Sequence, residues 1–293
     1  FFFQAEDGIR YSVASRGLGD VYKRQKLKNG DSIDMGAGDD QVSVMLTGSN
    51  GTPTISAANL TKLDGGAGTD TLQFEESGSN TSELTLTTAG ATNFENIKGT
   101  AGAETIKGDN NANVLTGNGG ADTLYGYGGN DTLYANHETY GDVDNVSDNL
   151  YGGAGDDTLV GSTGDNILDG GTGADTIRGA LGVDTFVLRT GSGGAAITDA
   201  DTFLDFTDGT DLIGLDNGMT FSELTIEQGT GSYSSHTIVK KGSEYLAVVE
   251  NMTASDLTES SFTPVDIDES GTMTASSAFI LPLVDSGTDI DVT

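Results

Sequence analysis

Aspartates recur at a fixed spacing through the middle of this sequence, and their carboxylates are ligands for hard cations. Between residues 98 and 187, half of the aspartates stand sixth in a nine-residue unit rich in glycine. Carboxylate and carbonyl oxygens are the donors that hard divalent cations prefer. The chain has 45 acidic and 13 basic residues, a net charge of −32, and so acidic a chain repels itself when compact. We therefore expect divalent cations to offset the charge at these positions.

The composition also excludes several classes of function. Binding nucleic acid through a basic patch needs many Lys and Arg side chains, and the chain has only 13 such residues. No run of about 18 apolar residues is present that could form a membrane-spanning helix. The chain has no cysteine, which excludes disulfides and thiolate metal sites.

The nine-residue unit has the pattern Gly-Gly-x-Gly-x-Asp-x-aliphatic-x. It fills two runs, Gly99–Tyr134 and Gly152–Val187, and Val143–Tyr151 is a decayed copy that keeps Asp148 in the aspartate position. Two isolated copies lie upstream and place Asp40 and Asp70 in that position. Self-similarity at a fixed short period is typical of repeat architectures.

Each unit combines a flexible half with a β-forming half. Its glycines can take positive φ and turn tightly, and its last three residues, such as Thr158-Leu159-Val160, favour a strand. One apolar residue per nine cannot form a helix stripe, which needs spacings of three and four. A single unit cannot bury that residue, whereas stacked units can share one narrow core. The sequence therefore predicts an all-β solenoid.

The repeat resembles that of RTX proteins, the haemolysin-type calcium-binding nonapeptide repeat family. The resemblance implies a right-handed parallel β-roll in which two nonapeptides make one 18-residue coil. It also implies calcium between successive turns, bound by the repeat's Asp and by backbone carbonyls of the glycine-rich loop. Coils stacked about 4.8 Å apart leave room for two calcium–oxygen contacts of about 2.3–2.6 Å, whereas magnesium at about 2.0–2.1 Å is too small.

The resemblance further implies two columns of residues in the aspartate position, one on each side of the roll. The first column is Asn113, Asp131, Asp157 and Asp175; the second column is Glu104, Asp122, Asp148, Asn166 and Asp184. Asp131 joins the first column only if the eight residues 135–142 loop out of their coil. Sites that involve Glu104, Asn113 or Asn166 are expected to be weaker or empty.

The predicted calcium ligands follow from these columns. The first choices are Asp131, Asp157 and Asp175. The other predicted carboxylates are Asp122, Asp148, Asp184, Asp70 and Asp40, and the predicted loop glycines are Gly152, Gly155, Gly170, Gly173, Gly126 and Gly117.

Five segments are expected along the chain. Residues 1–25 lack the repeat and resemble translated sequencing-adapter read-through, so the natural protein is expected to extend further upstream; the alternative is a flexible arm. Residues 26–97 are an irregular β segment with isolated repeats, and residues 98–187 are the roll. Residues 188–265 alternate apolar and polar residues and are predicted to form an antiparallel β cap. Residues 266–293 are a polar, acidic tail and a candidate type I secretion signal.

The resemblance implies a secreted, calcium-binding module that folds on meeting extracellular calcium and serves as the C-terminal export region of a larger protein. An alternative is an adhesive module that binds a polysaccharide or a cell surface through its outer strands and the 135–142 loop. A third possibility is an enzyme upstream of residue 26. We expect no catalysis in the chain itself, because its two histidines, His137 and His236, lie 99 residues apart and no nucleophile or metalloprotease motif is present.

Overall fold

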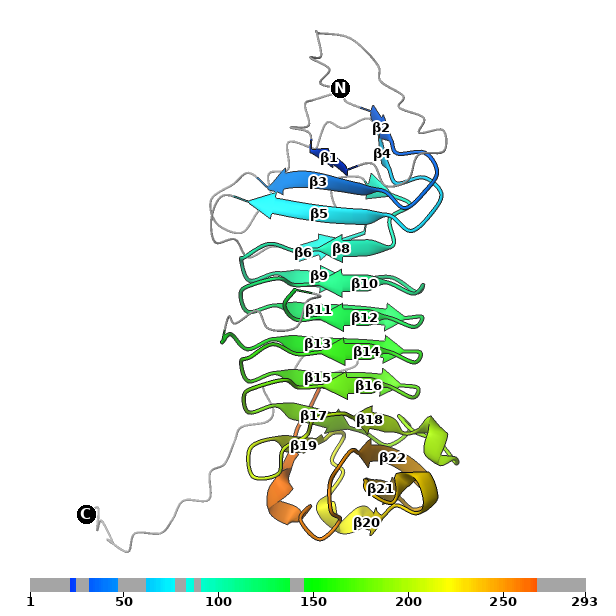
Figure 1. Cartoon of the computed structure of the whole chain (residues 1–293), viewed down its shortest axis with the longest axis vertical. Coiled ribbons are helices and arrows are strands. Elements are labelled where there is room, and N and C mark those ends of the chain that lie inside the picture. Colours follow the sequence, from blue (N-terminus) through cyan, green and yellow to red (C-terminus); the bar gives the residue numbers. More distant parts are fainter. Residues whose placement is uncertain are drawn as a thin grey trace, which may run out of the picture.

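The computed structural model describes residues 22–24, 32–46, 62–76, 83–86, 91–137 and 145–267. These residues form strands and short 3-10 turns, with no α-helix among them. The strands stack as successive rungs of one elongated parallel β-roll with a wider cap at its lower end (Figure 1). The expected all-β parallel roll is confirmed. No helix in these ranges has the length and apolar character to cross a membrane.

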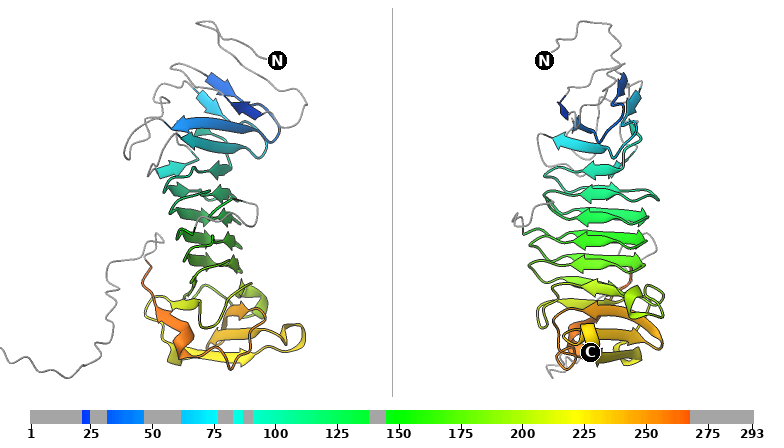
Figure 2. Two further views of the ribbon diagram at one scale, coloured as in Figure 1. Left: turned by 60° about the vertical axis from the view of Figure 1, so that its left-hand side comes forward. Right: turned by 45° about the vertical axis from the view of Figure 1, so that its right-hand side comes forward.

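Two parallel sheets form the sides of the roll, and the chain alternates between them (Figure 2). The central strands of one sheet are β8 (Asn96–Lys98), β10 (Val114–Thr116), β12 (Thr132–Tyr134), β14 (Thr158–Val160), β16 (Thr176–Arg178) and β18 (Asp201–Phe203). The other sheet contains β6 (Glu83–Thr85), β9 (Thr105–Lys107), β11 (Thr123–Gly128), β13 (Asn149–Ala154), β15 (Ile167–Thr172), β17 (Thr185–Leu188), β19 (Leu212–Leu215) and β23 (Phe262–Pro264).

The strand register shows where the chain departs from 18 residues per coil. Thr158 pairs with Thr176, one coil on, whereas Thr132 pairs with Thr158, a step eight residues longer. The N–H of Ala135 still bonds to Val160, but Asn145 bonds to Thr163, 18 residues away. The extra residues therefore lie between Ala135 and Asn145, as predicted from the sequence. Residues 138–144 of this insertion are outside the described residues.

A single file of apolar side chains fills the space between the two sheets. Leu133, Leu159 and Ile177 from one sheet face Leu124, Leu150, Leu168 and Phe186 from the other, and all are 0% exposed. The same holds for Leu72, Ile106 and Leu115, so each apolar residue expected at the eighth repeat position is buried. Since each coil buries only two such residues, the core becomes continuous only when many coils stack.

The roll continues upward into residues 22–92. The strands β1 (Tyr22–Arg24), β3 (Gln41–Leu46) and β5 (Thr71–Glu76) extend one sheet in parallel. A separate three-stranded sheet is formed by β2 (Ser32–Asp34), β4 (Lys62–Asp64) and β7 (Ala91–Thr92). Part of the segment expected to be extraneous therefore supplies β1, and residues 1–21 are outside the described residues.

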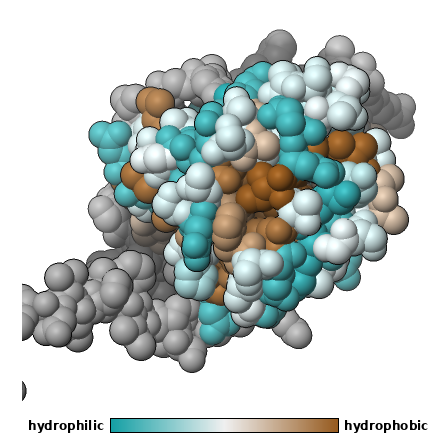
Figure 3. Space-filling view, turned by 90° about the horizontal axis from the view of Figure 1, so that it is seen from below, coloured by the Kyte–Doolittle hydropathy of each residue, from teal (hydrophilic) through white to brown (hydrophobic). Residues whose placement is uncertain are grey.

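The cap combines continued coils with an antiparallel unit. The strands β20 (Leu224–Gln228), β21 (Thr237–Lys241) and β22 (Glu244–Val249) pair antiparallel, as predicted for this segment. The strands β18, β19 and β23 instead pair in parallel with the roll. The reason is burial: Phe203 and Ile213 pair with Ile177 and Phe186 and continue the apolar file. Seen from below, the cap shows hydrophobic side chains surrounded by polar ones (Figure 3).

Candidate calcium sites

Glycine-rich turns connect the two sheets and stack directly on one another. Gly153 and Gly155 have φ of 109° and 129°, a region that glycine enters without steric cost. A Cβ on Gly155 would lie 1.9 Å from the carbonyl oxygen of Gly129 in the coil above, and one on Gly173 would lie 2.1 Å from that of Gly155. Only glycine allows this stacking, which places each turn's carbonyls against the next turn.

The first column is a ladder of hydrogen bonds between backbone and carboxylate. The N–H of Asn113 donates to Oδ1 of Asp131 at 2.7 Å, and the N–H of Asp131 donates to Oδ1 of Asp157 at 2.7 Å. The N–H of Asp157 in turn donates to Oδ1 of Asp175 at 2.8 Å. The structure therefore brings the three first-choice aspartates into one column, each separated from the next by a single coil.

The second carboxylate oxygen of these aspartates accepts no hydrogen bond. In Asp131, Asp157 and Asp175, Oδ2 is buried and has no donor among the described residues. A Cβ on Gly152 would lie 2.4 Å from Oδ2 of Asp157 and 2.5 Å from the carbonyl oxygen of Gly170. A carboxylate oxygen and a carbonyl oxygen thus face the same small space, which a glycine leaves open. Two such oxygens repel each other unless a cation lies between them.

The same arrangement occurs one coil earlier. A Cβ on Gly126 would lie 2.3 Å from Oδ2 of Asp131 and 2.5 Å from the carbonyl oxygen of Gly152. A Cβ on Gly170 would lie 2.1 Å from Oδ2 of Asp175. Gly126, Gly152 and Gly170 therefore lie beside the predicted carboxylates, two of them with a carbonyl directed at the shared space, whereas Gly155 and Gly173 lie against carbonyls of the neighbouring turns.

Burial makes the charged form of these carboxylates costly. It raises the pKa of Asp131 to about 7 and that of Asp157 to about 6, although each carboxylate accepts a backbone hydrogen bond that lowers the pKa. Burial likewise raises the pKa of Asp175 to about 7, with a further contribution from the charge of Asp157. A divalent cation would remove this penalty, because it favours the ionised form.

The second column repeats the ladder on the other side of the roll. The N–H of Asp122 donates to Oδ1 of Asp148 at 2.8 Å, and that of Asn166 donates to Oδ1 of Asp184 at 2.9 Å. A Cβ on Gly117 would lie 2.3 Å from Oδ2 of Asp122. The decayed copy that contains Asp148 therefore occupies its place in the column. Burial raises the pKa of Asp184 to about 7.

Two of the positions without aspartate are satisfied within the chain. Both carboxylate oxygens of Glu104 accept hydrogen bonds from Thr100, one from its N–H and one from its hydroxyl group. Oδ1 of Asn113 accepts from the N–H of Asp109 at 2.8 Å, and its Nδ2 donates to the carbonyl of Glu95 at 2.9 Å. Both side-chain polar atoms of these residues thus have protein partners, whereas Oδ2 of Asp131, Asp157 and Asp175 has none among the described residues.

Asp40 and Asp70 form a separate start to the ladder near the upper end of the roll. The N–H of Asp40 donates to Oδ1 of Asp70 at 2.8 Å, and that of Asp70 donates to Oε2 of Glu95 at 2.7 Å. Oδ2 of Asp40 and of Asp70 is buried and accepts no hydrogen bond from the described residues. Burial raises the pKa of Asp70 to about 6.

Sequence reasoning missed the residues that continue the columns beyond the nonapeptides. The N–H of Asp175 donates to Oδ1 of Asp201 at 3.1 Å, and the N–H of Asp184 donates to Oδ1 of Asp211 at 3.0 Å. Asp201 is 1% exposed, and burial raises its pKa well above the usual value. Its position was detectable, since Asp201 follows Asp175 by the same 26 residues that separate Asp131 from Asp157.

The donor set suits calcium rather than a metal bound by side chains alone. Within the described ranges, no three His, Asp or Glu side chains gather closely enough to hold a metal ion. Any cation between the turns must therefore use backbone carbonyls as well. Calcium accepts six to eight oxygen ligands, carboxylate and carbonyl, in flexible geometry. The buried Oδ2 atoms and the facing glycine carbonyls fit that requirement.

Comparison with known proteins agrees with this chemistry. No curated protein matches the chain. Among solved structures, the chain is similar to the AlgE6R3 subunit of the Azotobacter vinelandii mannuronan C5-epimerase, with 23% identity and a TM-score of 0.24, over 74% of this chain and 94% of that one. The family model for the RTX calcium-binding nonapeptide repeat (4 copies) matches residues 98–133 and 148–186. Residues 98–133 and 148–186 of the chain are therefore RTX calcium-binding nonapeptide repeats.

Proposed function

We propose that calcium binds between successive turns of the two columns and that this binding drives the roll to fold. The proposal depends on one observation: Oδ2 of Asp131, Asp157 and Asp175 is buried, accepts no hydrogen bond from the described residues, and lies beside the glycine-rich turns. In the absence of a cation these carboxylates must be protonated or remain charged and desolvated, and both cost free energy. Calcium offsets that cost only in the folded roll, because the extended chain has no stacked turns.

Coupling of calcium binding to folding would make the folded state of the roll depend on the calcium concentration around it. The chain stays extended where calcium is scarce and folds where calcium is at millimolar concentration, as binding free energy becomes folding free energy. We therefore propose that the chain is secreted and that the roll is the C-terminal export and folding module of a larger protein. The resemblance to RTX proteins supports type I secretion machinery as its partner, with the tail 266–293 as the signal. Residues 268–293 of that tail are outside the described residues.

Circular dichroism of the whole chain tests the folding step. In chelator we expect little strand signal, and on titration with calcium a cooperative gain, with equilibrium dialysis giving several bound ions per chain. Magnesium at the same concentration should give a much smaller gain, because its contacts of about 2.0–2.1 Å are too short for this space. A spectrum that is unchanged between chelator and calcium contradicts the proposal.

Export is tested separately, in cells that carry a type I exporter. The full chain should accumulate outside the cell in a folded form when the medium contains calcium. The same chain without residues 268–293 should remain inside. Equal export of both chains would contradict the proposed signal and leave calcium-coupled folding intact.

A further inference from the structure

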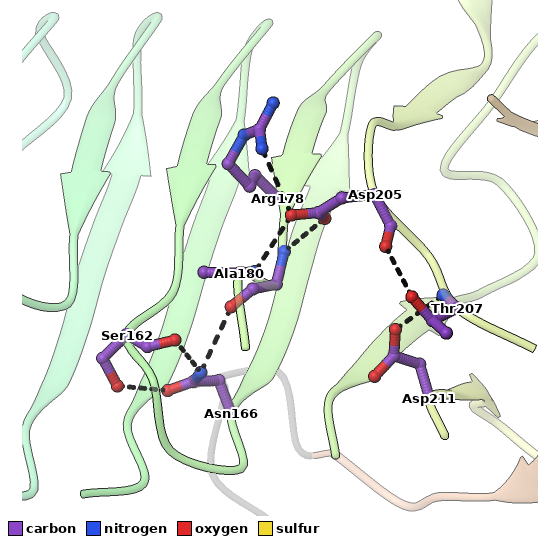
Figure 4. Close-up of polar contacts among 8 residues, drawn as sticks. Ser162, Asn166, Arg178, Ala180, Asp205, Thr207 and Asp211 are labelled. Atoms are coloured by element: carbon purple, nitrogen blue, oxygen red, sulfur yellow. Dashed lines mark hydrogen bonds and ion pairs between the residues drawn. The ribbon is translucent and has the colours of Figure 1, made fainter. Parts of the chain in front are cut away.

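Asn166 differs from every aspartate in the columns by the number of bonds that its side chain makes. Its Nδ2 donates to the carbonyl of Gly164 at 2.7 Å and to Oδ1 of Asp184 at 2.9 Å. Longer contacts join Nδ2 to the carbonyls of Ser162 at 3.3 Å and Gly179 at 3.4 Å. One nitrogen is thus surrounded by four oxygens, three from glycine-rich turns and one from the next carboxylate. Figure 4 shows part of this arrangement.

The amide nitrogen lies where the aspartates place an oxygen. A Cβ on Gly161 would lie 2.9 Å from Nδ2 of Asn166 and 2.5 Å from the carbonyl oxygen of Gly179. In the first column, the corresponding Cβ on Gly152 meets Oδ2 of Asp157 and the carbonyl oxygen of Gly170. The backbone is therefore alike in both turns. Oxygen faces oxygen at Asp157, whereas N–H faces oxygen at Asn166.

The other atom of the amide is also fully used. Oδ1 of Asn166 accepts from the N–H of Asp148 at 3.1 Å, so the ladder of the second column continues through it. The hydroxyl of Ser162 lies 3.1 Å from the same Oδ1 and 2.8 Å from the carbonyl of Val146, which share its single proton, and it accepts from the N–H of Gly164 at 3.3 Å. These bonds fix which end of the amide points toward the carbonyls. The orientation is set by the chain itself.

Protein groups also close the lower end of this column. Asp205 accepts from the N–H groups of Gly179 and Ala180 at 2.9 and 3.1 Å, and Arg178 lies 3.4 Å from its Oδ2. Asp211 accepts from the N–H of Asp184 through Oδ1 and from that of Thr207, at 2.7 Å, through Oδ2. Asp205 and Asp211 thus both accept hydrogen bonds from N–H groups (Figure 4).

We infer that the amide group of Asn166 replaces one calcium ion, so that the protein alone holds the turn of Asn166 against the turns next to it in the second column. This inference rests on the proposed function, because an amide can replace an ion only in a roll whose other turns bind calcium. The two sides of the roll then differ: the first column needs the metal at Asp131, Asp157 and Asp175, and the second column does not need it at Asn166.

Asn166→Asp is the direct test, because it restores a carboxylate to a turn whose backbone already matches the calcium-binding turns. We expect one more calcium ion per chain than in the wild type, measured by equilibrium dialysis. We also expect the midpoint of thermal unfolding to fall in chelator and to recover in calcium. The new Oδ2 would face the carbonyl oxygens that the amide N–H groups of Asn166 contact in the wild type, and only a cation between these oxygens would relieve their repulsion. Asn130→Asp is the matched control: it adds the same charge in an exposed part of a turn, where Asn130 accepts the N–H of Asp156, and it should leave the calcium count unchanged.

Asn166→Ala decides the matter if the aspartate variant does not fold. It removes the amide and adds no ligand, so the thermal midpoint should fall equally in chelator and in calcium while the calcium count stays at the wild-type value. If Asn166→Ala binds one calcium ion fewer than the wild type, Asn166 is itself a calcium ligand. If a folded Asn166→Asp binds the same number of ions as the wild type, this turn cannot hold calcium even with a carboxylate. Either result overturns the inference. If the wild type itself binds no calcium, the proposed function fails as well, whereas a calcium-binding wild type with either contrary result defeats this inference alone.

Discussion

The two columns of the roll share a backbone and differ in how their polar groups are satisfied. In the first column, Asp131, Asp157 and Asp175 follow one another, and each leaves a buried Oδ2 that accepts no hydrogen bond from the described residues. In the second column, Asn166 interrupts the aspartates, and its amide contacts the oxygens that surround it. Both columns are equally regular in register. The stacking of turns therefore does not depend on which chemistry fills the space between them.

The difference shows that two sets of residues have separate tasks. The glycines and the apolar file specify the coil, because they allow the turns to stack and supply the core. The sixth residue of each repeat decides whether the stacked turn needs a cation. Asp131, Asp157 and Asp175 each leave Oδ2 without a donor among the described residues, whereas Asn166 at the same position supplies its own N–H groups. A repeat can thus lose calcium without losing its place in the fold.

The largest effect is expected from Asp157→Ala in the first column. It removes an Oδ2 that faces a glycine carbonyl and leaves the N–H of Asp131 without its acceptor at 2.7 Å. An unsatisfied buried N–H alone costs about 1–3 kcal/mol, and the loss of one calcium ion adds to this. Calcium dialysis should give one ion fewer, and denaturant unfolding in calcium should show the lower stability.

Asp156→Ala is the matched control for that variant, since it deletes the neighbouring carboxylate of the same turn. Asp156 is exposed and accepts the N–H of Ala174 at 3.0 Å. The calcium count should remain at the wild-type value. An equal loss of calcium in both variants would mean that the charge of the turn matters and the column does not.

A smaller effect, more specific to the site, is expected from Gly152→Ala. Its Cβ would lie 2.4 Å from Oδ2 of Asp157 and 2.5 Å from the carbonyl oxygen of Gly170, so the methyl group fills the space between the ligands. We expect about 1–3 kcal/mol of overpacking together with one calcium ion fewer. Gly161→Ala in the second column should destabilise the roll by a similar amount with no change in the calcium count. Dialysis and denaturant unfolding of both variants measure this contrast.

Gly128→Ala provides the control for added volume. The nearest atom to its Cβ would be Oδ1 of Asn110 at 3.6 Å, an ordinary contact. This variant should keep both its calcium and its stability. A loss of calcium in Gly161→Ala as large as in Gly152→Ala would remove the distinction between the two columns.

The sequence was sufficient to predict the roll and the members of each column, because both follow from a strict period. Asp131 could be assigned to the first column because an insertion of eight residues was recognised between two phased runs. The period ends at Val187, so Asp201 and Asp211 could not be identified by motif although the same ladder includes them. The cap was only partly predicted: Phe203 and Ile213 join the apolar file through parallel pairing, a tertiary contact that local alternation of residues does not reveal.

The role of Asn166 was also beyond the sequence. From the sequence, Asn in place of Asp at position 166 predicted a calcium site that is either weaker or empty. Both predictions assumed that a calcium ligand had been lost and that nothing had replaced the ion. The structure shows four oxygens around the amide nitrogen, which spacing alone cannot reveal. Whether an Asn leaves a turn unsatisfied depends on the direction of its amide, and here the N–H of Asp148, which can only donate, sets that direction.

The next effect, smaller again, is a pH dependence of the stabilisation by calcium. Burial raises the pKa of Asp131 to about 7 and that of Asp157 to about 6 in the folded roll, whereas the unfolded value is near 3.8. Protonation therefore stabilises the metal-free roll fully below pH of about 4, and this stabilisation is lost as the pH rises through about 6–7. Protons also compete with calcium for the same oxygens.

Both effects act in one direction on a single measurable quantity. The difference in thermal midpoint between calcium and chelator should shrink as the pH falls from 8 to 5, which circular dichroism can follow. Asn166→Asp should show a larger difference than the wild type at pH 8, since it adds one more carboxylate that needs either a proton or an ion. If the difference in thermal midpoint between calcium and chelator does not change with pH, the buried carboxylates are not the calcium ligands.

The smallest effect is expected from Arg178→Ala at the closed end of the second column. Arg178 lies 3.4 Å from Asp205, and both side chains are partly exposed to solvent, so the pair should contribute about 0.2–1 kcal/mol to the free energy of unfolding. Asp205→Ala should cost more, because the N–H groups of Gly179 and Ala180 then lose their acceptor. Neither variant should change the number of bound calcium ions. A different result for Asp205→Ala would be a lower midpoint of thermal unfolding in chelator but not in calcium. That result would mean that the carboxylate of Asp205, with its two N–H donors, stabilises its turn in the way that a calcium ion stabilises turns elsewhere in the roll.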